Sequence, residues 1–232
     1  MIKHHNFEQK SDEWINARLG KITGSGINQL FGTSLASTRY LSKKASEILT
    51  NSTSDSDISN LIHVQRGLLF EREAREKYTL ATFTEVDNIG LIELDDYTAC
   101  SPDGLVGADG IIEIKVPDTY NYLSNIFKIT ENGSKGIAKE YYEQMQFNLY
   151  VSRRQWCDYI MYNPFYSQYN DGLFIYRVEV NYEMQSKIKK ILAVSIQKIQ
   201  KMLNDFNNIV GAERVLNINM DSFVNNDYMV KH

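Results

Sequence analysis

The clearest pattern of apolar and polar positions lies between residues 111 and 116. The segment Ile111–Val116 is rich in β-branched residues and is followed by Pro117, which predicts a β-strand that ends there. Because side chains in a strand alternate between its two faces, Glu113 and Lys115 share one face, roughly 6.6 Å apart along the strand. The opposite face is apolar and is expected to face a core: Ile112, Ile114 and Val116.

A turn signal directly precedes this strand. The segment Gly107–Gly110 contains an Asp-Gly pair, which favours a hairpin that returns toward residues 99–105. In a register centred on this turn, Asp103 lies opposite Glu113. The pattern therefore predicts that two carboxylates and the ammonium group of Lys115 converge on a single patch.

Periodicity over the rest of the chain predicts an α/β fold, a mixed β-sheet flanked by helices on both faces. The expected helices cover residues 14–50, 63–81, 136–152 and 182–204. The expected strands cover residues 89–116, 157–162 and 173–180. In the last helix, apolar residues recur at helical spacing with lysines opposite, so this helix should pack on the sheet or on a partner subunit.

Length and composition predict one domain over residues 1–232, with a weakly patterned tail from about residue 205. The chain is 43% hydrophobic, which is enough to bury a full core, and no linker divides it. The polar run 50–60 predicts a surface loop or a disordered insertion. The sequence shows neither a signal peptide nor an apolar run long enough to span a membrane, so a cytoplasmic protein is expected.

Cysteine and histidine residues give no metal signature. The two cysteines, Cys100 and Cys157, lack zinc-ligand spacing and are predicted to be buried thiols of a cytosolic protein. His4 and His5 form a pair that could bind a metal, but an exposed, mobile terminus is the favoured interpretation.

The formal net charge of −4 argues against a protein that coats DNA through bulk positive potential. Binding of nucleic acid should instead use local basic clusters that contact phosphates. The candidate clusters are Arg39, Lys43 and Lys44; Lys135 and Lys139; and Arg153 with Arg154. Taken singly, each of these residues is more often a solvated surface charge.

The predicted patch has the composition of a metal-dependent phosphodiesterase site. Hard cations such as Mg²⁺ prefer oxygen ligands and keep several waters, so Asp103, Glu113 and a scissile phosphate could form an open site. Lys115 could position the attacking water, or deprotonate it if the site lowers its pKa. A Glu-x-Lys pair alone would favour an ordinary surface strand, but the segment Ser101–Gly104 at hairpin distance reverses this preference.

Glu71 is a polar residue on an apolar helical stripe. It recurs with Ala74 and Tyr78 at helical spacing, whereas Arg72, Glu73 and Lys77 are expected to face outward. A carboxylate on a core-facing stripe is costly unless it is paired or binds a metal. A buried ion pair is the alternative to a role in the site.

Gln144 presents the same situation on a later helix. It lies between Tyr141 and Phe147, at three residues on either side, on an apolar face. A structural amide that is hydrogen-bonded to the backbone and an active-site amide are equally good interpretations.

The segment Thr23–Gly26 resembles a phosphate site because it offers hydroxyl groups and accessible backbone N–H groups before a helix. Arg18 would add a planar, permanently charged donor that suits phosphate. On the sequence alone, Ser25 is equally well a helix cap and Arg18 a surface charge.

Five segments together resemble the PD-(D/E)xK nucleases and, within them, the lambda-exonuclease-like (YqaJ-like) phage recombination exonucleases. They occur in family order and cover most of the chain: Trp14–Ser25, Arg66–Ala74, Thr98–Leu105, Glu113–Pro117 and Tyr142–Gln146. One departure is that relatives often carry a basic residue shortly after the Lys-x-Pro, where this chain has Asp118–Asn121.

The resemblance implies a restriction-endonuclease-like fold and assigns roles to the candidate residues. It implies a metal shell of Asp103, Glu113, the backbone carbonyl of Ile114 and Glu71, with Lys115 and Gln144 in the active site. It also implies Mg²⁺ as the cofactor, with Mn²⁺ as a substitute and two ions per site. Arg18 and Ser25 would grip the 5′-phosphate of the strand that is digested.

The function expected on this basis is a Mg²⁺-dependent exonuclease that degrades one strand of duplex DNA from a 5′ end and leaves 3′ overhangs for recombination. The resemblance further implies a ring-shaped homotrimer and a partner that anneals single strands, in a bacterial or phage-infected cell. Two alternatives are an endonuclease of the same fold and a DNA-end-binding protein without catalysis. The second is disfavoured because every catalytic position is filled.

Overall fold

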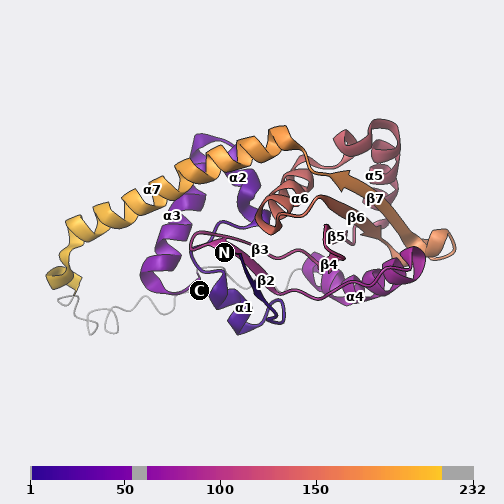
Figure 1. Cartoon of the computed structure of the whole chain (residues 1–232), viewed down its shortest axis with the longest axis horizontal. Helices are drawn as coiled ribbons and strands as arrows, with labels where there is room; N and C mark the ends of the chain where they lie inside the picture. The colour runs from indigo at the N-terminus through magenta and orange to yellow at the C-terminus, as the bar shows by residue number, and fades with distance from the viewer. Residues whose placement is uncertain (1, 54–61, 216–232) are drawn as a thin grey trace, which may run out of the picture.

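Two β-sheets organise the chain in the computed structural model, which describes residues 2–53 and 62–215 (Figure 1). The smaller sheet has the order β1-β2-β3 and the larger the order β4-β5-β6-β7. The strands are β1 (Lys3–His5), β2 (Leu91–Asp95), β3 (Thr98–Cys100), β4 (Gly104–Val106), β5 (Gly110–Lys115), β6 (Trp156–Tyr162) and β7 (Leu173–Glu179). The larger sheet is mixed, since β5 and β6 are parallel and its other pairs antiparallel.

The mixed sheet flanked by helices is confirmed, but the strands expected over residues 89–116 belong to two sheets rather than one. The division falls at the segment between β3 and β4, which contains Pro102. Proline cannot donate a ladder hydrogen bond, so this segment leaves the first sheet before the second begins.

Helices cover the larger sheet from two sides. They are α1 (Asp12–Ala17), α2 (Ile27–Phe31), α3 (Ser34–Thr50), α4 (Ile62–Thr82), α5 (Thr119–Asn132), α6 (Lys139–Ser152) and α7 (Tyr182–Val215), with short 3₁₀ segments η1 (Gly24–Gly26), η3 (Gly133–Gly136), η4 (Pro164–Tyr166) and η5 (Asn170–Gly172). Helix α4 packs on β5, β6 and β7, whereas α6 contacts both sheets (Figure 1). Helix α6 is therefore the element that links the two halves of the molecule.

The predicted orientation of β5 is confirmed by its two packing environments. Ile112 and Ile114 belong to a buried apolar cluster with Ala74 and Tyr78 of α4. The other face of the strand carries Glu113 and Lys115 toward α6, where Gln144 donates a hydrogen bond to Glu113. Burial of one apolar face thus fixes which side chains the strand presents to the other side.

The hairpin register is the predicted one. Gly104 pairs with Ile112, and the pairing continues through Leu105 and Val106 to the turn. Beyond the strand end, the Asp103 backbone N–H donates to the Ile112 carbonyl at 3.1 Å. This continuation of the register places Asp103 opposite Glu113.

The helix expected over residues 14–50 is broken into four pieces, α1, η1, α2 and α3. The first break follows Ala17, and Gly20 there adopts φ +70°, a conformation that favours glycine. A Cβ at Gly20 would also lie only 2.3 Å from Ile48 Cγ1. Because the backbone N–H of Gly20 donates to the buried Glu47 at 2.9 Å, this turn is fixed against α3.

Two elements were not expected from the sequence. Strand β1 pairs His4 with Ile92 and His5 with Leu91, so the interpretation of His4-His5 as a mobile terminus was wrong. Helix α5 begins after Pro117, and the Asp118 carboxylate caps it by accepting from the Asn121 backbone N–H at 2.8 Å. Where relatives often carry a basic residue after the Lys-x-Pro, this chain therefore has a residue that caps a helix.

Most of the remaining boundaries differ by a few residues from those expected, and the end of the last helix differs by more. The predicted helix from 182 to 204 continues to Val215 as α7, which takes in the start of the tail. Most of the polar run 50–60 and residues 216–232 lie outside the described residues. Within the described part of the chain, none of the helices is long and apolar enough to cross a membrane.

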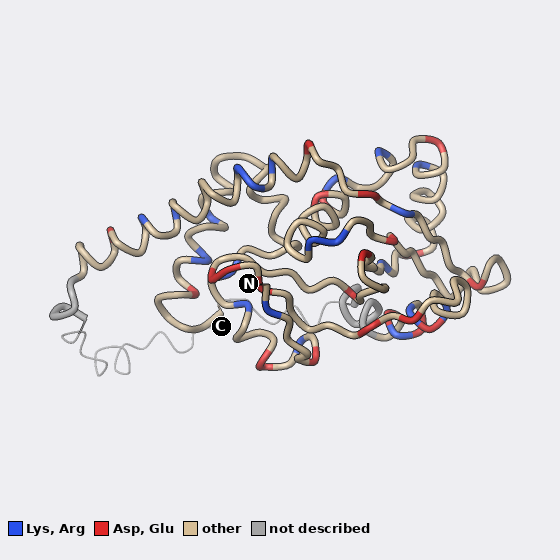
Figure 2. Tube along the Cα trace, in the orientation of Figure 1, with Lys and Arg blue, Asp and Glu red and all other residues tan. Residues whose placement is uncertain are grey.

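Basic residues are distributed over many elements and interspersed with acidic ones (Figure 2). Two of the candidate DNA-binding residues have structural partners instead. Lys44 is buried and forms an ion pair with Glu47 at 2.9 Å, so its assignment to a phosphate-binding cluster was wrong. Arg154 donates to the backbone carbonyls of Val106, Gly107 and Gly110, which fixes the hairpin turn.

Candidate active site

The centre of the candidate site is the carboxylate of Glu113, which is 1% exposed. Its Oε1 atom accepts hydrogen bonds from Lys115 Nζ and Gln144 Nε2, both at 2.6 Å. Its Oε2 atom accepts from Asn148 Nδ2 at 3.2 Å. Donors from β5 and α6 therefore satisfy this buried charge and fix its orientation.

Asp103 lies at the edge of the same strand. Its Oδ2 atom accepts from the backbone N–H of Ile114 at 2.6 Å, so the side chain replaces a ladder partner just before β4 begins. Because the N–H and C=O of one extended residue point to the same edge, the Ile114 carbonyl is also directed to this side. Asp103, Glu113 and the Ile114 carbonyl thus provide oxygen atoms at one end of β5.

Charge is not balanced between Asp103, Glu113 and Lys115. Burial, followed by the Glu113 carboxylate, raises the pKa of Asp103 to about 8, against the opposing effects of Lys115 and the Ile114 N–H. When two carboxylates share one cation, ionisation of the second carboxylate is disfavoured by the charge of the first. A divalent cation at this position would relieve that repulsion, which is the electrostatic condition for a metal site.

Lys115 is held as a cation. Burial lowers its pKa, but the carboxylates of Glu113 and Asp103 outweigh burial and raise the pKa above its ordinary value. The ammonium also lies 5.0 Å from the ring centroid of Tyr141. This arrangement favours a donor that orients water or phosphate, and it does not provide the lowered pKa that removal of a proton by Lys115 would need.

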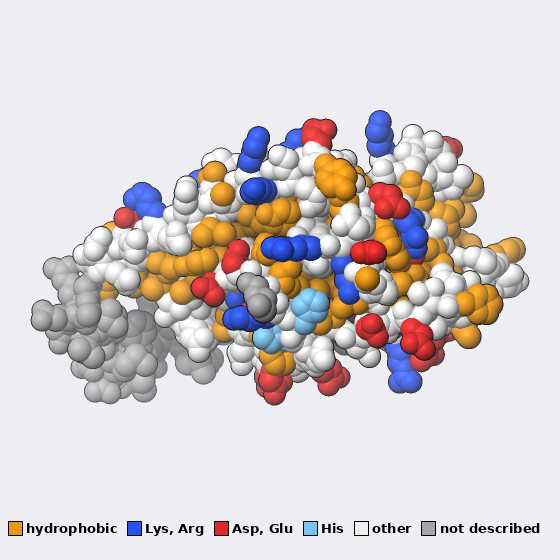
Figure 3. All heavy atoms as spheres, viewed as in Figure 1, with side chains coloured by type: hydrophobic (Ala, Val, Ile, Leu, Met, Phe, Trp, Pro, Cys, Tyr) orange, Lys and Arg blue, Asp and Glu red, His pale blue; other side chains and the backbone are white. Residues whose placement is uncertain are grey.

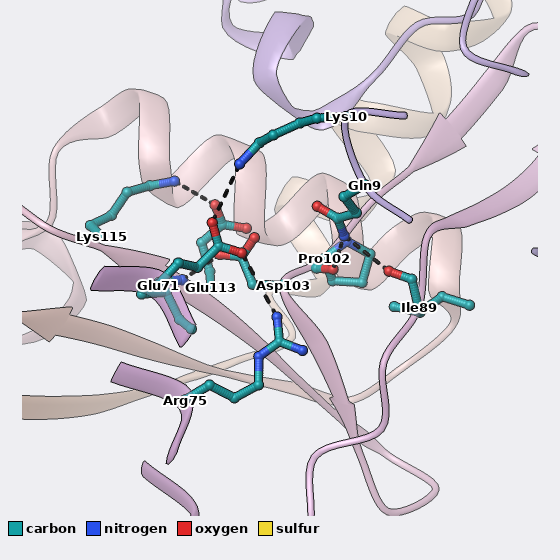
Figure 4. Close-up of polar contacts among 10 residues, drawn as sticks. Gln9, Lys10, Glu71, Arg75, Ile89, Pro102, Asp103, Glu113 and Lys115 are labelled. Carbon is teal, nitrogen blue, oxygen red and sulfur yellow. Dashed lines mark hydrogen bonds and ion pairs between the residues drawn. The ribbon is translucent and has the colours of Figure 1, made fainter. Parts of the chain in front are cut away.

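Glu71 lies beside the two other carboxylates but forms its own ion pairs (Figure 4). Its Oε2 atom is 3.6 Å from Lys10 Nζ, and its Oε1 atom is 3.7 Å from Arg75 Nη2. The charge of Glu71 nevertheless contributes to raising the pKa of Asp103. Glu71 therefore forms the ion pair that was the alternative to a role in the site, although its side chain is only partly buried. A role of Glu71 in binding a metal stays a prediction.

Two of the neighbours of Glu71 face differently from what the helical pattern predicts. Glu73 was expected to face outward but accepts a hydrogen bond from Tyr162 at 2.6 Å. Lys77 forms an ion pair with Asp171 at 3.2 Å. Both contacts hold α4 against β6 and against the η5 segment that precedes β7.

Gln144 and Gln146 have separate roles on α6. Gln144 donates to the carboxylate of Glu113 and, within the described part of the chain, its side chain makes no hydrogen bond to the backbone. Gln146, by contrast, donates to the Glu179 carbonyl at 2.8 Å and accepts from the Asn181 N–H at 2.9 Å. Of the two interpretations of Gln144, the geometry therefore favours the active-site amide, and Gln146 is the structural one.

Arg18 is directed to the acidic motif. It donates to Ser101 Oγ at 3.0 Å, and its guanidinium lies 4.0 Å from the ring centroid of Trp14. The indole N–H of Trp14 donates to the same Ser101 oxygen at 3.0 Å. Arg18 is thus bound to Ser101, two residues before Asp103 in the acidic motif, and is not a free surface charge.

Ser25 is exposed and caps neither η1 nor α2. Its hydroxyl lies 3.5 Å from the hydroxyl of Thr23, whose backbone N–H donates to Tyr40. The neighbouring Gly24 packs on α6 beside Gln144. The loop that carries Ser25 is therefore in contact with the helix that holds Glu113.

An open cleft borders the cluster and gives access to it. Its lining includes Lys10, Glu71, Lys115 and, from α5, Asn121. No group of three or more His, Cys, Asp or Glu side chains within residues 2–53 and 62–215 is arranged to hold a metal ion. Ligation by side chains would therefore rest on Asp103 and Glu113, with a carbonyl and water or phosphate oxygens completing the shell, as suits Mg²⁺.

Three residues of the site were not singled out from the sequence. Lys10 pairs with Glu71, and Asn148 binds Glu113. Gln9 donates to the carbonyls of Ile89 and Pro102, at 2.9 and 3.0 Å, and so holds the acidic motif (Figure 4). Asn148 had a sequence signal, since it lies four residues after Gln144 on the same helical face; Lys10 and Gln9 had none.

Comparison with protein families gives one match. Residues 13–155 match the model of the YqaJ-like viral recombinase domain, which is more than half of the chain. No curated protein matched the sequence.

Solved structures share the fold. An alkaline exonuclease, LHK-Exo from Laribacter hongkongensis, aligns with a TM-score of 0.76 and 28% identity over 86% of this chain and 98% of that chain. Another crystal structure of LHK-Exo contains dAMP and aligns equally well. A phage-related exonuclease from Haemophilus somnus 129PT aligns with a TM-score of 0.60 and 13% identity over 80% of this chain and 96% of that chain, which supports the fold alone.

Proposed function

Because the chain belongs to the family of YqaJ-like viral recombinase domains, we propose that it is a metal-dependent exonuclease. In this proposal it degrades one strand of duplex DNA from the 5′ end and leaves 3′ overhangs for homologous recombination. The structural match to an alkaline exonuclease over nearly the whole length of that protein supports the proposal.

The observation that carries the proposal is the convergence of distant segments on one end of β5. Asp103 and Glu113 meet there beside Lys115, and Gln144 reaches Glu113 from α6. Arg18 joins the same region through Ser101. A structural ion pair would not need donors from so many parts of the chain next to an open cleft.

The proposed cofactor is Mg²⁺, with Mn²⁺ as a substitute and two ions per site. Bound at Asp103, Glu113 and the Ile114 carbonyl, Mg²⁺ would supply a nucleophilic hydroxide and neutralise charge on the phosphate. Gln144 holds the Glu113 carboxylate in place, and Lys115 would donate to the attacking water or to a phosphate oxygen. Glu71 would become a further metal ligand if its ion pair with Lys10 were replaced by a contact with the metal.

The proposed selectivity for 5′ ends rests on Arg18 and Ser25. Arg18 is oriented by Trp14 and Ser101, which places its planar guanidinium next to the acidic motif. Ser25 presents an exposed hydroxyl from a loop that packs on the helix of Gln144. Together they would bind the terminal phosphate while the first phosphodiester lies at Asp103 and Glu113.

One assay separates this function from its alternatives. Linear duplex labelled at either the 5′ or the 3′ end is incubated beside closed circular DNA, with Mg²⁺ or with EDTA. An exonuclease that starts at 5′ ends releases the 5′ label first, leaves the circle intact and stops in EDTA. Cleavage of the circle would indicate an endonuclease, and binding of ends without any release of label would indicate a protein without catalysis.

We also propose a ring-shaped homotrimer, a single-strand annealing protein as partner, and action in the cytoplasm of a bacterial or phage-infected cell. Support for subunit contacts comes from apolar side chains along α7, where Val194, Phe206 and Ile209 are exposed. A band of hydrophobic side chains also follows this helix on the surface (Figure 3). Light scattering should report about three times the 26.8 kDa mass of the chain, whereas a monomer would reject the ring.

A further inference from the structure

Asn148 is a buried amide that reaches the Glu113 carboxylate from α6. Its side chain is 1% exposed, and Nδ2 donates to Glu113 Oε2 at 3.2 Å. One helical turn earlier, Gln144 donates to the other oxygen, Oε1, at 2.6 Å. Because the two oxygens are held by separate amides on one helix face, the rotation of the carboxylate plane is fixed as well as its position.

The other end of this amide faces the loop that carries Ser25. Asn148 Oδ1 is buried and accepts no hydrogen bond from the described residues. It lies directly against Gly24, since a Cβ at that position would be 2.4 Å from Oδ1. Buried acceptors without a partner are uncommon, and each one needs a reason.

We infer that Asn148 is a positioning residue that couples the loop 23–26 to the Glu113 carboxylate. The inference rests on the proposed function, in which Ser25 binds the terminal phosphate and Glu113 binds the metal. One rigid, planar amide touches both parts, so the position of the loop and the orientation of the carboxylate are linked. A seated 5′-phosphate would then favour the productive orientation of Glu113.

Gln146 provides a matched control on the same helix. It is also a buried amide, at 0% exposure, but its partners are the backbone groups of Glu179 and Asn181 and the side chain of Gln185. Both of its polar ends are satisfied, and neither touches Glu113 or the loop. Loss of this amide should weaken folding without affecting the link between the loop and the carboxylate.

The test compares wild type, Asn148→Ala and Gln146→Ala on linear duplex with and without a 5′-phosphate, together with Mn²⁺ binding by calorimetry. Asn148→Ala should lower kcat about tenfold, since it removes a hydrogen bond to a charged group, and should weaken Mn²⁺ binding. It should also reduce the preference for phosphorylated ends, by roughly threefold or more, as expected for partial loss of one such contact. Gln146→Ala should keep the wild-type preference and Mn²⁺ affinity.

A second variant tests the contact from the loop side. Gly24→Ala places a methyl group against Asn148 Oδ1 and should also reduce the preference for phosphorylated ends. In the double variant the two losses should not add, because the contact is already absent. Additive losses would overturn the coupling, and a wild-type preference in Gly24→Ala would overturn it even if Asn148→Ala fails to fold.

The outcomes also separate this inference from the proposed function. If wild type digests DNA and prefers phosphorylated ends while Asn148→Ala retains that preference and the Mn²⁺ affinity, the coupling is wrong and the proposed function stands. If wild type digests both kinds of end equally, the coupling and the phosphate site are both rejected, but the nuclease is not. If wild type digests nothing, the proposed function itself fails.

Discussion

Two buried carboxylates lie on neighbouring strands of the larger sheet, Glu113 on β5 and Asp158 on β6, and only one of them belongs to a candidate active site. Asp158 is bound by Arg177 through two hydrogen bonds, at 2.8 and 2.9 Å, and by the Tyr78 hydroxyl at 2.7 Å. Arg177 in turn stacks on Trp156, 3.7 Å from the ring centroid. This cluster has one negative and one positive charge and is complete.

The region of Glu113 is different because its charges do not balance. Asp103 and Glu113 share the cation of Lys115, and the pKa of Asp103 is raised to about 8 by burial and by Glu113. An open cleft borders this cluster. The comparison teaches that burial of a carboxylate does not by itself indicate function; an uncompensated charge next to an accessible cleft does.

The largest effect on cleavage is expected from substitutions in the region of Glu113. If the proposed function is right, Asp103→Ala, Glu113→Ala and Lys115→Ala should each slow cleavage a hundredfold or more, about 3 kcal/mol, because each would remove a proposed metal ligand or the cation proposed to orient the reaction. Binding of DNA ends should remain. Single-turnover digestion and gel-shift titration measure the two quantities, and near-wild-type turnover by purified Glu113→Ala would contradict the assignment.

The opposite pattern is expected at Asp158. Asp158→Ala should lower the free energy of unfolding by about 2 to 3 kcal/mol, since it leaves the Arg177 guanidinium and the Tyr78 hydroxyl without their partner. This loss is smaller than the roughly 3 to 5 kcal/mol typical of a fully buried pair, because Arg177 is half exposed. Urea denaturation measures the loss. Turnover at a temperature where the variant is folded should stay close to wild type, and a hundredfold loss there would remove the distinction between the two carboxylates.

The active-site half of this comparison could be predicted from the sequence because its signals are local. The turn Gly107–Gly110 sets the register, and the alternation in β5 sets the face, so the meeting of Asp103 and Glu113 follows from a short segment. The Lys10–Glu71 pair could not be predicted in this way. It joins residues that are distant in sequence, and no periodic pattern encodes such a contact.

Errors in the predicted elements have similar physical causes. Helix α5 was overlooked although its apolar residues recur at helical spacing; part of this apolar face is buried, at Tyr122 and Ile129, and part is exposed, at Tyr120, Leu123 and Phe127. The available signal was Asp118 after Pro117, a helix cap that stops the strand and starts the helix. Strand β1 has only three residues and forms through its pairing with β2, so its sequence alone carries little information.

A smaller effect on the digestion rate is expected from substitution of Arg18. It tests whether the site next to Asp103 and Glu113 recognises the 5′-phosphate. If Arg18 binds the terminal phosphate, wild type should digest dephosphorylated ends about tenfold more slowly, the value of one charge-assisted hydrogen bond. Arg18→Ala should remove the difference between the two substrates, and Arg18→Lys should restore only part of it because lysine lacks the planar donor group. Initial rates on paired substrates provide the measurement. Equal rates on both ends in wild type would reject the phosphate site.

The pH dependence of stability tests the charge imbalance between Asp103, Glu113 and Lys115 directly. The pKa of Asp103 rises from its ordinary value of 3.8 to about 8 in the folded protein, so the folded state retains a proton that the unfolded state loses. The stability gained from this proton is present at low pH and is lost as pH rises toward 8. In EDTA, the unfolding midpoint should therefore fall between about pH 4 and 8, and Asp103→Asn should flatten this slope because nothing titrates there. Added Mg²⁺ should raise the midpoint more at the upper end of this window, since it binds the deprotonated pair. A slope that is equal in wild type and Asp103→Asn would show that the two carboxylates are balanced after all, as Asp158 and Arg177 are.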